Sequence, residues 1–237
     1  MLSGIIKQII VITDGHSNKG GCPIAAAGRA RGTGVSVSVI GILDSGRLGE
    51  KGAAEVKQIA KAGGGIHQFI SIQELAYTLS CVTVQATQFT VQQQADRKLL
   101  QLTGMKLRQL PPAARNEVLP YLARLEEELE VHLALVLDTS GSMIKKRAEI
   151  EKSIQDLVVS LDSRKGSVKL AIIQYPGPSG QGSIIKSLDG DNGVTLKVLQ
   201  QIIYGGFTPT GPAIDLAAGA LLGGKGVKGN NLVVGVK

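Results

Sequence analysis

Tryptophan is absent from this 237-residue chain, and aromatic residues make up only 3% of it. Its core must therefore be built from aliphatic side chains. The two cysteines, Cys22 and Cys81, lie far apart and lack the spacing of a metal site, which favours reduced thiols over a disulfide. No apolar run is long enough to span a bilayer, and the first residues lack a secretory pattern. We therefore expect a cytoplasmic protein that makes no membrane contact.

Signatures of common enzyme sites are also missing. The chain has three histidines and contains no GxSxG elbow, no GxxxxGK[ST] phosphate loop and no HExxH helix. A nucleophilic triad has little support, so we predict no catalytic residues and no enzyme activity. A metal-dependent hydrolase or phosphatase is an alternative, but a DxDx phosphotransferase would need an aspartate where Ser140 stands.

The positive charge does not form a recognisable nucleic-acid site. The net charge is +7, but the basic residues are scattered and lack interleaved aromatic residues. This arrangement is more typical of a solvated surface than of a nucleic-acid groove. A nucleic-acid-associated protein is an alternative that depends on charge alone. The 43% hydrophobic and 19% charged content is that of a folded protein.

Strand and helix patterns alternate along the chain. Short β-branched runs are typical of buried strands, and longer stretches with apolar residues on one face predict helices. Such alternation favours an α/β fold, a doubly wound, mostly parallel sheet flanked by helices, with one antiparallel edge strand. The predicted strands are 8–12, 35–42, 66–70, 131–137, 168–175 and 183–188; the predicted helices are 23–31, 52–62, 72–102, 113–130, 144–161, 194–203 and 212–222.

Oxygen-bearing side chains gather at the ends of three predicted elements. The run Asp138-Thr139-Ser140-Gly141-Ser142 follows an apolar strand, Asp14 follows another, and Thr208 precedes a helix. Ligands of open α/β sheets collect at the carboxyl ends of strands. A hard divalent cation such as Mg²⁺ or Mn²⁺ prefers oxygen ligands of this kind. The sequence therefore predicts a metal site.

Each of these residues also has a purely structural interpretation. Ser140 and Ser142 could cap the helix that follows them, Thr208 could cap the helix at 212, and Asp14 could be a turn residue. Other polar residues near the motifs are more typical of a solvated surface. They are His16 and Asp215. For the run Lys145-Lys146-Arg147, which flanks the site, a solvated first turn and a role in steering an acidic partner are equally plausible.

The segments DTSGS, GGFTPTG and VITDG, each beside the expected strand or helix, resemble those of von Willebrand factor A (VWA) domains. In that family they build the metal-ion-dependent adhesion site (MIDAS). The resemblance implies that Asp138, Ser140, Ser142, Thr208 and Asp14 hold Mg²⁺ or Mn²⁺, with the aspartates acting mainly through water. It also implies that an Asp or Glu of a partner protein completes the metal's coordination.

The order of the segments differs from that of an ordinary A domain, because TDG comes first. The chain therefore resembles a circularly permuted VWA domain that occupies residues 1–237. Residues 1–84 would be the C-terminal half of the fold, 85–130 a helical linker, and 131–237 the N-terminal half with DxSxS. This order is similar to that of YabS-type proteins of endospore-forming bacteria, which implies a link to sporulation.

The apolar stretch 231–236 leaves a second topology open. It could compete with the strand at 8–12 for one place in the sheet, and two chains would then exchange halves in a domain-swapped dimer. We favour a monomer. Our leading hypothesis is a metal-dependent protein-binding module whose partner supplies a carboxylate.

Overall fold

A single mixed sheet organises the chain in the computed structural model, which describes residues 4–43, 49–188 and 196–223. Its strand order is β3-β2-β1-β4-β5-β6, and every neighbouring pair is parallel except β5 and β6. This confirms the predicted fold class. The strands are β1 (Ile6–Thr13), β2 (Val35–Ile42), β3 (Gly64–Ile70), β4 (Val131–Asp138), β5 (Val168–Tyr175) and β6 (Ser183–Lys186).

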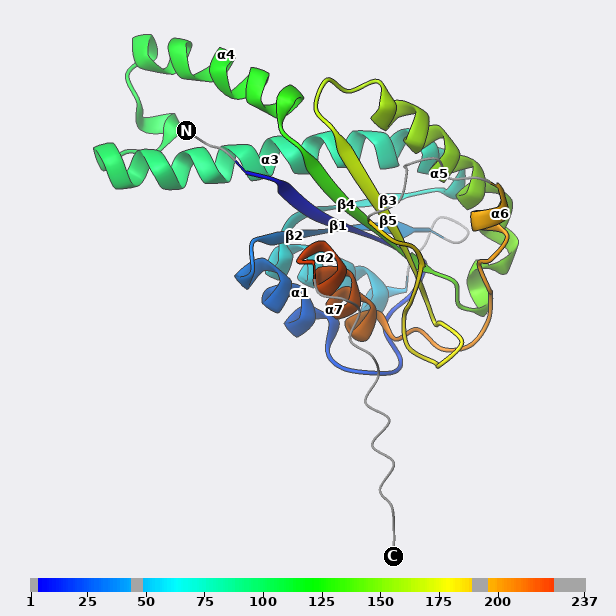
Figure 1. Cartoon of the computed structure of the whole chain (residues 1–237). Helices are drawn as coiled ribbons and strands as arrows, with labels where there is room; N and C mark the ends of the chain where they lie inside the picture. The colour runs from blue at the N-terminus through cyan, green and yellow to red at the C-terminus, as the bar shows by residue number, and fades with distance from the viewer. Residues whose placement is uncertain (1–3, 44–48, 189–195, 224–237) are drawn as a thin grey trace, which may run out of the picture.

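Helices cover both faces of this sheet (Figure 1). On one face lie α1 (Pro23–Gly32), α2 (Glu50–Gly63) and α7 (Thr210–Leu221). On the other face α3 (Leu75–Thr103) and α5 (Arg147–Asp162) pack on the sheet, accompanied by α4 (Pro112–Glu128) and the short α6 (Leu196–Leu199). Three 3₁₀ segments complete the described elements: η1 (Ile72–Glu74), η2 (Leu107–Gln109) and η3 (Gly141–Lys146).

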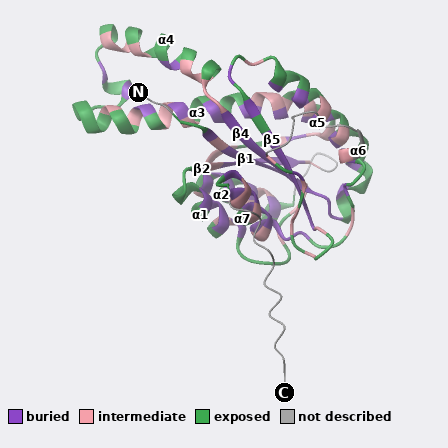
Figure 2. Ribbon diagram, in the orientation of Figure 1, coloured by how far each residue is buried: buried purple, intermediate pink, exposed green. Residues whose placement is uncertain are grey.

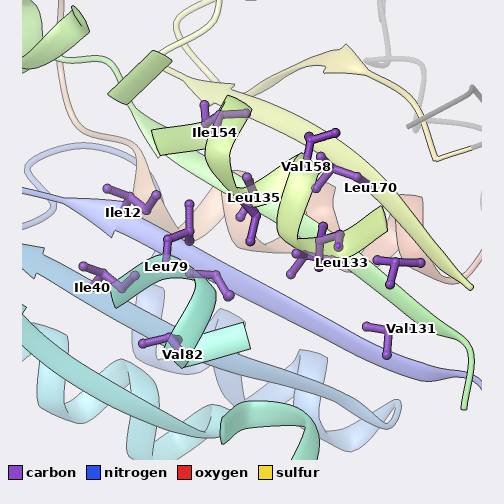
Figure 3. Packing of buried hydrophobic residues seen from close by; sticks show 14 of the residues in the cluster. Ile12, Ile40, Leu79, Val82, Val131, Leu133, Leu135, Ile154, Val158 and Leu170 are labelled. Atoms are coloured by element: carbon purple, nitrogen blue, oxygen red, sulfur yellow. The ribbon is translucent and has the colours of Figure 1, made fainter. Parts of the chain in front are cut away.

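The core is aliphatic, as the scarcity of aromatic residues predicted. Successive residues of a strand point to opposite faces, so β4 sends Leu133 and Leu135 to one side and Ala134 and Val136 to the other. The larger side chains pack against α3 and α5 (Figure 3). The smaller ones allow α7 to approach the sheet closely. All of these side chains are fully buried.

Helices α3 and α4 continue beyond the edge of the sheet as a paired arm (Figure 1). The first part of α3 buries residues such as Leu79 and Val82, whereas Leu100 and Leu102 near its end are exposed. Figure 2 shows exposed residues along both helices of the arm. The boundary between residues 84 and 85, where a linker was predicted to start, lies inside this continuous helix. The helix therefore serves first as cover for the sheet and then as part of the arm.

Several predicted boundaries were wrong. The helix expected from position 144 is preceded by the 3₁₀ segment η3, and α5 begins only at Arg147. The helix expected over 194–203 is limited, within the described residues, to α6. Residues 231–236, on which the domain-swapped alternative depends, lie outside the described residues. Cys22 and Cys81 are free thiols, and no described helix is both long enough and apolar enough for a membrane span.

Candidate metal centre

The carboxyl ends of β1 and β4 meet at the centre of the sheet. These strands pair in parallel with Ile12 opposite Leu137, so Thr13 and Asp138 follow side by side. The Thr13 hydroxyl donates a hydrogen bond of 2.7 Å to Asp138 Oδ2. The pairing thus joins two motifs that are 125 residues apart in the chain.

The loop after β4 curls around the Asp138 carboxylate. Oδ1 of this fully buried residue accepts a hydrogen bond of 2.9 Å from the Ser140 N–H. The two serine hydroxyls, Ser140 Oγ and Ser142 Oγ, lie 3.2 Å apart. Ser140 precedes η3 but makes no side-chain capping bond, so its hydroxyl remains directed toward Ser142 rather than toward the helix.

Asp14, which follows β1, adds its carboxylate to this group of oxygens. The Ser142 hydroxyl donates to Asp14 Oδ1 at 2.8 Å, although the two residues are 128 positions apart. The Asp14 side chain is only 2% exposed. The hydrogen bond expected of a simple turn residue is made instead by Thr13, whose hydroxyl accepts the Gly15 N–H at 3.2 Å.

Lys146 is not part of a solvated turn, one of the two interpretations that the sequence left open for the run Lys145-Lys146-Arg147. Its side chain is 8% exposed, and its Nζ donates to Asp14 Oδ2 at 2.5 Å and to the Ser142 carbonyl oxygen at 3.2 Å. A 3₁₀ segment has three residues per turn, so Met143 and Lys146 share its buried face. Lys145, between them in the turn, is exposed.

Thr208 is buried in the loop before α7, near the other segments. Its N–H donates to Asn18 Oδ1 at 2.8 Å, and its carbonyl oxygen accepts the Ser17 hydroxyl at 3.0 Å. These bonds attach the Thr208 loop to the loop after β1. Among the described residues, no hydrogen bond joins the Thr208 side chain to the aspartates or serines above.

Two further contacts fix the position of this loop. The Gly205 N–H donates to the Thr139 carbonyl oxygen at 2.7 Å, which ties the loop to the DTSGS segment. At Gly211 the backbone of α7 approaches the loop after β1 so closely that an added Cβ atom would clash with the Gly21 carbonyl oxygen. All three predicted segments therefore converge at one edge of the sheet.

Burial governs the electrostatics of this edge. It raises the pKa of Asp138 from 3.8 to about 6, against the hydrogen bonds from Ser140 and Thr13, which lower the pKa; the nearby negative charge of Asp14 adds a smaller increase. Burial also raises the pKa of Tyr175, which pairs with Asp138 across β4 and β5, well above its usual value. Tyr175 is therefore a neutral phenol next to Asp138 in the sheet.

The spacing of the oxygens fits a small hard cation. In an octahedral Mg²⁺ site with bonds of about 2.1 Å, neighbouring ligand atoms lie about 3 Å apart. The separations of 3.2 Å between the serine hydroxyls and 2.8 Å between Ser142 and Asp14 match this edge length. Among the described residues no cluster of three or more His, Cys, Asp or Glu could hold a metal, so a site here depends on the hydroxyls.

Sequence reasoning missed three of the residues that organise this edge: Asn18 and Ser17, which hold the Thr208 loop, and Thr13, which donates to Asp138. It placed Lys146 beside the motif but missed its pairing with Asp14. The three-residue spacing between the buried Met143 and Lys146 is the one sequence signal that could have identified the lysine. Of the remaining polar residues, His16 is exposed and Asp215 pairs with Arg29 on the surface.

Comparison with known proteins identifies the class to which this fold and edge belong. Residues 2–99, which include Asp14 and strands β1 to β3, match the von Willebrand factor type A domain. The chain belongs to this family, with the segment that carries TDG placed before the segment that carries DxSxS.

Two relatives match nearly the whole chain. The uncharacterized protein YabS of Bacillus subtilis (strain 168) is 34% identical over 216 residues, which cover 90% of this chain and 88% of YabS. The crystal structure of an uncharacterized protein from Alicyclobacillus acidocaldarius subsp. acidocaldarius DSM 446 has a TM-score of 0.85 and 39% identity, covering 92% of this chain and 94% of that chain. The resemblance to VWA and YabS-type proteins is thereby confirmed.

Proposed function

We propose that this protein is a metal-dependent binding module that captures an acidic residue of a partner protein. The observation that carries the proposal is the contact of 2.8 Å between Ser142 Oγ and Asp14 Oδ1, which joins the two halves of the motif. Ser140, Ser142 and Asp14 would hold Mg²⁺ or Mn²⁺, with Asp138 and Thr208 beside them. The bound cation would supply a positive charge that attracts a carboxylate from outside.

The exposure of the residues supports this role. Asp138 is fully buried and Ser140 is 5% exposed, whereas Ser142 belongs to the exposed surface. A cation held by these residues would lie between the core and the solvent, where a second protein could reach it. Two of these three ligands, Ser140 and Ser142, are neutral hydroxyls, so the cation would keep part of its charge for a partner.

Affinity capture from a native lysate tests the proposal, with Mg²⁺ in one arm and a chelator in the other. Wild-type protein should retain a partner only with the metal, and Asp138→Asn should retain none in either arm. Asp156→Asn, at an exposed position on α5, is the matched control and should behave as wild type. The decisive step is replacement of the partner's Asp or Glu residues by amides. Capture that survives both the chelator and Asp138→Asn would refute the proposal.

A further inference from the structure

A cavity of about 590 Å³ lies between α3, the C-terminal part of α4 and the C-terminal part of α5. Its volume is in the range of small-molecule sites in proteins. The turn at 163–165, which contributes to its wall, leads toward the amino end of β5, whereas the candidate metal centre lies at the carboxyl ends of β1 and β4. The cavity is therefore separate from the metal centre.

Four of the described residues that line this cavity are charged, and two of them pair with each other. Lys165 Nζ lies 2.7 Å from Glu127 Oε2, and both side chains are well exposed. The other two, Arg164 and Glu126, are half-buried, and no salt bridge links either of them to the other or to a further described residue. The wall thus contains one cation and one anion without an ionic partner.

Partial burial disfavours the charge of both groups. Burial lowers the pKa of Arg164, while the nearby charge of Glu127 raises it to a smaller extent. Burial likewise raises the pKa of Glu126, against a hydrogen bond with Gln88 that lowers it. The Arg164 guanidinium, which has five N–H donors, makes one hydrogen bond within the described residues, from Nη2 to the Glu126 carbonyl oxygen. Both groups therefore have unused capacity for an opposite charge.

Apolar side chains supply a further part of the wall, with Val84 on α3 and Leu157 and Leu161 on α5. Such a surface accommodates a hydrocarbon group. Thr87 also lines the cavity, and its hydroxyl accepts a hydrogen bond of 2.6 Å from the buried amide of Gln8. The Oε1 atom of this amide has no hydrogen-bond partner among the described residues, although an unpaired buried acceptor is costly. Polar groups beside the cavity are thus not all satisfied by the described chain itself.

We propose that this cavity binds a small zwitterion of the class of apolar amino acids and short apolar peptides. Arg164 contacts the carboxylate of the ligand, Glu126 contacts its ammonium, and the apolar wall contacts its hydrocarbon part. A simple anion or a simple cation would satisfy only one of the two charges. This site is independent of the metal centre. If Arg164 served only as a cap for the last carbonyl groups of α4, no such ligand would bind.

NMR titration of the ¹⁵N-labelled full chain with L-leucine and with the dipeptide L-leucyl-L-leucine tests the inference and distinguishes a free amino acid from a peptide. At least one probe should bind saturably and shift the amide signals of residues 157–164. Acetylation of the probe's ammonium, or amidation of its carboxylate, should each weaken binding about tenfold or more. Absence of saturable binding by both probes at about 10 mM, or equal binding of free and blocked forms, would overturn the inference.

Two variants assign the charges. Glu126→Gln should abolish the preference for the free probe over its acetylated form, and Arg164→Gln the preference over its amidated form, because each removes the charge that the blocked group would meet. Glu128→Gln on α4 and Lys152→Gln on α5, at exposed positions outside the cavity wall, make the same changes of charge and should keep both preferences. The blocked probes are tested on wild-type protein, so the test stands even if Arg164→Gln does not fold. Wild-type preferences in Glu126→Gln would overturn the assignment.

Discussion

Strands β1 and β4 are buried along almost their whole length, but their bodies and their carboxyl ends are stabilised in different ways. Along the bodies, aliphatic side chains such as Ile12 and Leu135 are removed from water on both faces of the sheet. At the ends, two acids and a lysine are equally removed from water. Burial is favourable in the first region, at about 25 cal/mol per Å² of apolar surface, and costly in the second.

The strand bodies stabilise the fold through apolar burial, whereas the carboxyl ends of the strands reduce its stability because they bury the charged groups of the site. Asp138 is compensated by hydrogen bonds from Thr13 and Ser140, and Asp14 by the ammonium of Lys146. The apolar side chains of the strand bodies, a few residues away, need no such compensation. Substitution of Asp138 should therefore change stability in the direction opposite to that of substitutions in the strand bodies.

The largest effect is expected in the strand bodies. Leu135→Ala should lower the free energy of unfolding by about 3 kcal/mol, because Leu135 is fully buried between the sheet and its helices (Figure 3) and the substitution leaves a cavity. Urea denaturation of the metal-free protein measures the change. Leu102→Ala, at a position that is 71% exposed on the arm, is the control and should lose almost nothing. Equal losses in the two variants would contradict the division of the chain into core and arm.

Substitution of Asp138, at the end of β4, should change the free energy of unfolding in the opposite direction. Asp138→Asn should raise the free energy of unfolding of the metal-free protein at pH 8 by about 1–3 kcal/mol, since it removes a buried charge at nearly constant shape. The raised pKa of Asp138 determines the pH range over which this gain changes. A raised carboxyl pKa contributes stability below the ordinary value of 3.8, and this stability is lost as the pH rises through about 6.

The gain of Asp138→Asn over wild type should therefore shrink as the pH falls from 8 toward 4, where both side chains are neutral. Urea denaturation at the two pH values, with a chelator present, measures the difference. An Asp138→Asn protein that is less stable than wild type at pH 8 would show that hydrogen bonds to the carboxylate outweigh its desolvation. The comparison of the two regions would then fail at this residue.

Much of the sheet could be predicted from sequence, because its strands are continuous apolar runs that end at recognisable turns. The approach of Asp14 to Ser142 could also be inferred, since parallel strands place their carboxyl ends at one edge. These features depend on local composition and on one general property of parallel sheets. They do not depend on the detailed path of the loops.

The details of the edge could not be predicted, because they depend on pairs of residues distant in sequence. Burial of Lys146 is intelligible only once Asp14, 132 positions away, is known to lie against it. The link between Asn18 and Thr208 spans 190 positions and has no sequence pattern. The 3₁₀ path of η3 likewise depends on how Met143 packs, and the propensities of its residues do not specify it.

The smallest effect is expected from the ion pair that most resembles Asp14–Lys146 in its contacts and differs in its exposure. Arg29 donates two hydrogen bonds to Asp215, between α1 and α7, and both side chains are well exposed, at 61% and 44%. Solvent screening leaves such a pair with little net energy. Asp215→Asn should therefore leave the melting temperature unchanged within error, whereas Asp14→Asn, which removes the charged carboxylate that contacts the buried ammonium of Lys146, should lower it measurably in the metal-free protein. Differential scanning calorimetry of both variants checks this, and a comparable shift for the two would mean that burial does not distinguish the ion pairs.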